Sequence, residues 1–248
     1  MPFATYVDRV ILQAGITLAC TLPFVWIAAS HSHTRRWGLL LFVASLVVLD
    51  AALLEIRRVD GFQHHHWSWQ ESLLSSAWPF LVVALVPGIS LVSIGVTSHL
   101  RPYWLKPCMV AVLVTIAVPA VFFILGTRKK LDAEGWAFLL IMPGVAEELV
   151  FRGVYQSLLN RAFGKPWRSA NAEFGWGLII TAILFAGFNG LVSVDSQLHA
   201  RIVLPAAIAP FLSSLVSGWV RERTDSVWPS VFGHNLSNIV IPVASLFA

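Results

Sequence analysis

Long apolar runs occupy most of this chain, and they constrain its fold more than any other feature. A helix needs about 20 apolar residues to cross a bilayer. Runs of about that length cover residues 10–30, 37–56, 73–96, 107–126, 136–159, 174–191, 202–220 and 227–247. Only 12% of the residues are charged, which is about half the share in an average soluble domain. The sequence therefore predicts an all-α, polytopic membrane protein with about eight transmembrane helices.

The residues between the runs fit the same interpretation. Many of the 11 tryptophans fall near the ends of runs, where aromatic side chains sit at the membrane–water interface. Basic residues are scattered through short loops, which favours membrane lipid as a partner and gives no reason to expect nucleic-acid binding. They are divided almost evenly between alternate loops, so they select no orientation. We expect an integral, multi-pass protein of the plasma membrane whose first helix is retained.

Two features that could suggest a metal or redox site have simpler interpretations. Cys20 and Cys108 both lie inside apolar runs and form no CxxC motif, so we expect two small buried side chains. His64, His65 and His66 lie in a loop, where a solvated interfacial cluster is favoured over a metal site. We therefore predict neither a cofactor nor a bound metal.

Two adjacent carboxylates stand out within the fifth run. Glu147 and Glu148 are followed by Arg152, and an ionisable cluster in a membrane segment is a candidate functional site because charge in hydrocarbon is costly. Glu148 and Arg152 are four residues apart, so on a helix they share a face and can pair. Glu147 is rotated by about 100°. This spacing predicts one neutralised acid and one acid that is free to react. The simpler alternative is a structural ion-pair cluster at a helix end.

Polar residues also interrupt the sixth and eighth runs. His234 and Asn238 are four residues apart in the last run, so on a helix they would offer hydrogen-bond donors to one place, as oxyanion stabilisation requires. Asn189 lies near the end of the sixth run. By itself, Asn189 could equally form a hydrogen bond between helices.

Taken together, these residues resemble the three-motif signature of the CPBP family, the CAAX prenyl protease 2-like and Abi intramembrane proteases. Glu147-Glu148-xxx-Arg152 resembles its first motif and His234-xxx-Asn238 its third. The second motif is FxxxH, but here Phe185 is followed four residues later by Asn189. The resemblance covers residues 131–248, which it implies form a CPBP/Abi-type protease core. For residues 1–130, the apolar runs predict about four N-terminal transmembrane helices.

The resemblance also implies an activity, which is peptide hydrolysis inside the membrane without a covalent intermediate. Glu147 would activate a water molecule, while Glu148 and Arg152 would hold the helix and orient Glu147. His234 and Asn238 would stabilise the oxyanion. Asn189 would replace the histidine that helps to hold the water, and an amide cannot exchange a proton at physiological pH. The substrate would be a membrane-associated or lipidated peptide or protein.

Three alternatives remain open at this stage. Asn189 favours a catalytically silent scaffold or bacteriocin-immunity-type protein on the same fold. A small-solute transporter could use Glu147 as a proton or cation site, although the chain lacks the paired broken helices of many transporters. A metal-dependent hydrolase could use Glu147, His234 and His199, but no HExxH motif is present.

Overall fold

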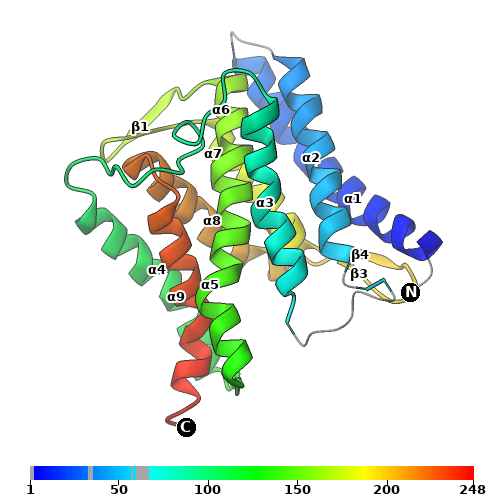
Figure 1. The fold of residues 1–248 in the computed structure, drawn as a ribbon, viewed down its shortest axis with the longest axis vertical. Helices are drawn as coiled ribbons and strands as arrows, with labels where there is room; N and C mark the ends of the chain where they lie inside the picture. Colours follow the sequence, from blue (N-terminus) through cyan, green and yellow to red (C-terminus); the bar gives the residue numbers. More distant parts are fainter. Residues whose placement is uncertain (1–2, 33–35, 57, 60–66) are drawn as a thin grey trace.

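The computed structural model describes the whole chain except residues 1–2, 33–35, 57 and 60–66. The histidine triplet at positions 64–66 lies outside the described residues. The chain is built mainly from helices that run roughly along the long axis of the molecule (Figure 1). A helix is present within each of the eight segments predicted from hydropathy.

Three of the described helices are long and apolar enough to cross a bilayer unaided. They are α1 (Phe3–His31), α2 (Trp37–Ile56) and α4 (Leu105–Ile124). Large apolar side chains are exposed along α4, including Met109, Leu113 and Ile124. Apolar surface of this extent is typical of contact with lipid rather than water. These helices indicate a membrane protein, and the number of crossings, which we predict to be eight, stays a prediction.

The third predicted segment differs from the structure at both ends. Helix α3 spans Trp69–Leu85, so it begins earlier and ends well before residue 96. Pro87 follows the C-cap residue Val86 and cannot continue α-helical hydrogen bonding, and Gly88 has a φ of +75°. The chain then forms an extended loop, residues 86–104, with short turns. Hydropathy alone missed this helix end because the loop is also apolar.

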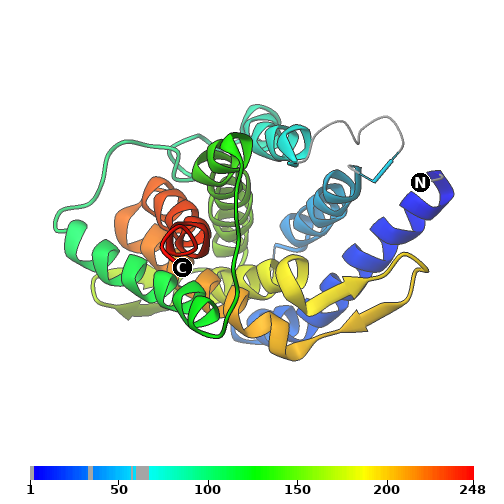
Figure 2. The same ribbon diagram turned by 90° about the horizontal axis from the view of Figure 1, so that it is seen from below.

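One long helical rod lies at the centre of the molecule. It consists of α5 (Ala133–Glu148), a π-helical segment η1 (Leu149–Tyr155) and α6 (Gln156–Phe163). Viewed from below, α5 has α3 on one side and α9 on the other (Figure 2). A proline within an apolar run, here Pro143, predicts a bend in the helix, but α5 continues through it. The departure from α-helical hydrogen bonding instead follows the acidic pair.

The remaining helices come from the C-terminal part of the chain. They are α7 (Trp176–Ala186), the π-helical segment η2 (Gly187–Leu191), α8 (Leu204–Thr224) and α9 (Trp228–Ala244). The main core joins both parts of the chain, because Val47 and Trp78 share it with Leu158 and Leu184. The N-terminal helices therefore pack directly against the segment that carries the acidic pair.

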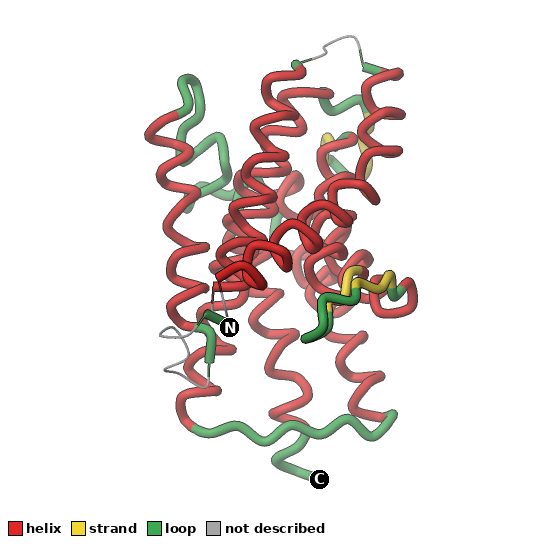
Figure 3. Tube along the Cα trace, turned by 90° about the vertical axis from the view of Figure 1, so that its right-hand side faces the viewer, coloured by secondary structure: helices red, strands yellow, loops and turns green. Residues whose placement is uncertain are grey.

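The described residues are mostly helical, as predicted, and two short hairpins accompany the helices. One pairs β1 (Trp167–Ser169) with β2 (Ala172–Phe174), and the other pairs β3 (Val192–Val194) with β4 (Ala200–Ile202). They lie at different heights along the long axis (Figure 3). Strands of three residues are too short to show the alternating pattern by which a strand is recognised.

Candidate functional site

An ion pair and a histidine form the buried base of the site. Arg152 Nε lies 3.0 Å from Glu148 Oε2, and both side chains are only 1% exposed. His234 Nδ1 lies 2.9 Å from the other carboxylate oxygen, Oε1. A carboxylate held by arginine is ionised and can only accept, so His234 Nδ1 donates. Glu148 thus links the rod to α9 and fixes the tautomer of the ring.

Aromatic contacts fix the orientation of this base. The Phe185 ring lies 4.9 Å from Arg152 Cζ and packs edge-to-face against His234, with ring centroids 6.1 Å apart. Phe151 packs edge-to-face against the same ring. A guanidinium over an aromatic face gains electrostatic energy where water is excluded. Phe185 therefore connects α7 to both partners of Glu148, Arg152 and His234.

Glu147 has a different environment from its neighbour. It is half-buried, and Asn189 Nδ2 donates to its Oε2 at 3.3 Å. Asn189 Nδ2 also donates to the backbone carbonyl of Phe185 at 3.2 Å. The position of Asn189 inside an apolar run predicts a buried side chain, but the structure places it at the surface, where η2 borders the cavities described below. Asn189 orients the carboxylate that the arginine does not hold.

The candidate residues Glu147, Asn189, His234 and Asn238 line one cavity of about 430 Å³. Apolar residues such as Leu139, Pro143 and Phe185 complete its wall. The polar groups come from the rod, from η2 and from α9, which are far apart in sequence. Glu148 and Arg152 lie behind this wall, where both are fully buried. A few convergent polar groups in an otherwise apolar cavity are typical of a ligand or active site.

A second cavity, of about 290 Å³, lies beside the first, and Glu147 and Asn189 line both. Its other polar residues include Asp50, Glu71 and Ser72 from α2 and α3. Glu147 is therefore reachable from two cavities, one bounded by the N-terminal helices and one by α4, α8 and α9.

The structure adds two residues that the motifs did not identify. Asn235 accepts from the Gly144 backbone N–H at 2.7 Å and donates to the Ile141 carbonyl at 3.1 Å, which ties α9 to α5. Asp50 is buried and accepts from Trp78 Nε1 at 3.1 Å and from the Tyr155 hydroxyl at 2.9 Å. A carboxylate in the middle of an apolar helix was a signal in the sequence, but its partners were not evident.

His199 does not join the site. It is exposed in the β3–β4 hairpin, where its Nδ1 lies 3.3 Å from Asp195 Oδ2. It therefore does not replace the missing histidine of the second motif. Among the residues that the structure describes, no cluster of three or more His, Cys, Asp or Glu side chains is arranged to hold a metal ion.

Comparison with known families identifies the part of the chain that carries this site. Residues 130–240 match the family model of type II CAAX prenyl endopeptidase Rce1-like proteins. No curated protein and no solved structure matched the chain. The matched range contains Glu147, Glu148, Arg152, Asn189, His234 and Asn238. The resemblance read from the motifs is confirmed over this range, where the Rce1-like domain at residues 130–240 supports a membrane protease of the CPBP family.

Proposed function

We propose that this protein is an intramembrane endopeptidase that hydrolyses a peptide bond of a membrane-associated or lipidated substrate. The supporting observation is the single cavity lined by Glu147, Asn189, His234 and Asn238. We further propose that the chain crosses the plasma membrane several times. Apolar helices α1, α2 and α4 support this topology.

Glu147 is the proposed general base. It is the carboxylate not held by arginine, and it lines the cavity in which a water molecule could meet a substrate carbonyl. Asn189 orients it through the 3.3 Å contact. General bases in proteins contribute about 10²- to 10⁴-fold to rate.

His234 and Asn238 are the proposed donors to the oxyanion. Because His234 Nδ1 donates to Glu148, its Nε2 is the atom left for the substrate. Nε2 carries a hydrogen only in the imidazolium form, whereas in the neutral ring it accepts. Oxyanion stabilisation therefore requires protonated His234, and Glu148 is the counter-ion for that charge. Asn238 donates through its amide in either case.

The direct test is cleavage of a prenylated or membrane-inserted peptide by the purified full chain, followed by mass spectrometry. We expect Glu147→Ala to abolish cleavage and Asn238→Ala to slow it by about 10²- to 10³-fold, the usual cost of one oxyanion donor. Glu173→Ala is the matched control, because Glu173 is exposed in the β1–β2 hairpin. Equal cleavage by Glu147→Ala and the parent chain would reject the proposed base.

Asn189 supports a second candidate, a catalytically silent membrane scaffold on the same fold. It stands where the second motif of the family has histidine, and an amide cannot carry a proton away from the reacting water. Asn189→His separates the two candidates. If the parent chain is inactive on every peptide offered and Asn189→His cleaves one of them, the scaffold is the better description. Cleavage by the parent chain supports the endopeptidase.

A further inference from the structure

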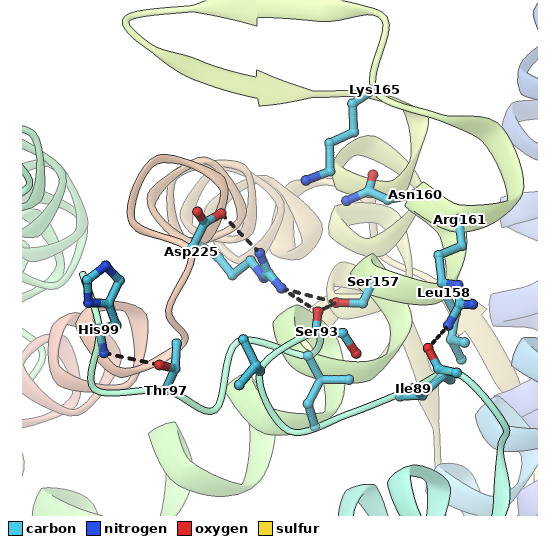
Figure 4. A pocket seen from close by; sticks show the side chains of 14 residues that line it. Ile89, Ser93, Thr97, His99, Ser157, Leu158, Asn160, Arg161, Lys165 and Asp225 are labelled. Carbon is cyan, nitrogen blue, oxygen red and sulfur yellow. Dashed lines mark hydrogen bonds and ion pairs between the residues drawn. The ribbon is translucent and has the colours of Figure 1, made fainter. Parts of the chain in front are cut away.

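A cavity of about 490 Å³ lies apart from the proposed catalytic site and shares no lining residue with it. It is bounded by the loop of residues 86–104, the end of α6 and the end of α8 (Figure 4). Glu147 and Arg161 are 14 residues apart on one continuous rod, which corresponds to about 21 Å along a helix axis. The cavity therefore lies at the end of the helices, away from their middle.

The lining of this cavity is strongly basic. Arg161, Lys165 and Arg221 supply three cations, and Asp225 supplies the one carboxylate among the lining residues. Beyond the lining, Glu222 binds Lys165 and Arg101 binds Asp225. The negative charge of Glu222 and the positive charge of Arg101 cancel, so the cavity and its neighbours together carry a net charge of two positive units.

The basic side chains have donors to spare. Arg161 is exposed and donates from one nitrogen to the Gly88 carbonyl at 2.7 Å. Lys165 Nζ lies 2.5 Å from Glu222 Oε2. A guanidinium carries five N–H donors and an ammonium three, so both side chains can bind an additional anion.

Arg221 supplies fixed charge beneath these two side chains. Its side chain is only 7% exposed, and it donates to the Ser93 carbonyl at 2.9 Å and to Ser157 Oγ at 3.3 Å. Its distance to Asp225 Oδ1 is 4.0 Å, so that carboxylate only partly offsets its charge. A buried arginine held this way keeps its charge in place without needing to rearrange.

The other wall of the cavity is apolar. Ile89, Val92, Ile94 and Leu158 line it, and Val92 is 67% exposed. The exposed Val92 side chain next to arginine and lysine, at the end of apolar helices, matches the level at which lipid headgroups meet acyl chains. Basic pockets between membrane helices are known to bind anionic headgroups.

We propose that this cavity binds the phosphate group of an anionic phospholipid, with Arg161 and Lys165 contacting the phosphate and Ile89 and Val92 contacting the first acyl carbons. A free phosphate ion shares the anionic chemistry but would not use the apolar wall. The proposal is independent of whether the protein cleaves peptides.

The test compares lipid binding by the purified full chain using native mass spectrometry. We expect tighter binding of phosphatidylglycerol than of phosphatidylcholine. We expect Arg161→Gln to weaken phosphatidylglycerol binding about fivefold, since one interfacial cation contributes about that factor. Arg161→Lys keeps the charge and should retain most of the binding. Arg168→Gln is the control, because Arg168 is exposed in the nearby hairpin and does not line the cavity.

Three results would overturn the proposal. The first is equal binding of the two lipids by the parent chain. The second is unchanged phosphatidylglycerol binding by Arg161→Gln when its melting temperature in phosphatidylcholine equals that of the parent. The third is inorganic phosphate displacing phosphatidylglycerol at equal concentration, which would assign the site to a free ion.

Discussion

At the scale of single residues, Gly144 sets the distance between the two helices that form the candidate site. A Cβ atom at this position would lie 2.5 Å from Asn235 Oδ1 and 2.6 Å from the Val231 carbonyl oxygen. Both distances are shorter than van der Waals contact permits. The hydrogen bond from the Gly144 N–H to Asn235 also depends on this approach. Glycine therefore allows α5 to bring Glu148 within reach of His234.

We expect Gly144→Ala to separate α5 from α9 and to lower stability by about 1–3 kcal/mol, as overpacking usually does. The proposed peptidase activity should fall as well. Glu148 and His234 are 2.9 Å apart, so a small separation of α5 from α9 would break their hydrogen bond. Gly15→Ala is the matched control, since a Cβ atom there meets nothing within 4 Å. Thermal unfolding in detergent measures the stability of both variants. A Gly144→Ala protein as stable as Gly15→Ala would contradict this account of the helix contact.

At the scale of elements, the π-helical segment η1 follows directly after the acidic pair and is anchored at its far end. Its last residue, Tyr155, donates to Asp50 on α2, and Trp78 on α3 donates to the same carboxylate. All three side chains are buried. A buried carboxylate is costly unless its oxygens are hydrogen-bonded. Asp50 thus holds the N-terminal helices against the rod that carries Glu147.

We expect the Asp50–Tyr155 contact to be measurable as a coupling energy. Asp50→Ala and Tyr155→Phe should each destabilise the protein, because each leaves a buried polar group without its partner. The double variant should be less destabilised than the sum, by about 0.5–3 kcal/mol. Tyr103→Phe serves as the control, since Tyr103 is 90% exposed. Strict additivity in unfolding measurements would show that the two side chains do not depend on each other.

The same elements show how far the sequence alone could lead. Helical spacing was sufficient to predict the Glu148–Arg152 pair, because both partners lie on one helix. The His234–Glu148 contact joins α9 to the rod, and no local pattern encodes a contact between helices. Asn235 was missed for the same reason, since it lies beside His234 in sequence but binds α5. The π-helical segments and hairpins were missed because hydropathy does not register hydrogen-bond geometry.

At the scale of the whole molecule, the two hairpins mark opposite ends of a pair of antiparallel helices. The β1–β2 hairpin ends just before α7, and the β3–β4 hairpin begins directly after η2. From Trp176 to Leu191 the helical segments contain 16 residues, or about 24 Å of rise. Helix α8 then returns over 21 residues, about 31 Å, which is close to the thickness of the bilayer core. The hairpins accordingly differ in height along the long axis (Figure 3).

This separation predicts that the two hairpins face opposite sides of the membrane. Arg168 and Gln197 are both exposed, one in each hairpin region. Single cysteines are introduced by Arg168→Cys or Gln197→Cys after Cys20→Ala and Cys108→Ala remove the native thiols. In intact cells, a membrane-impermeant maleimide should label only one of the two positions, and permeabilisation should expose the other. Ser169→Cys is the control and should follow Arg168→Cys, since the two positions are adjacent in β1. Labelling of both hairpins in intact cells would mean that α7 and η2 do not cross the bilayer, and the proposed topology would then lose its sixth and seventh spans together.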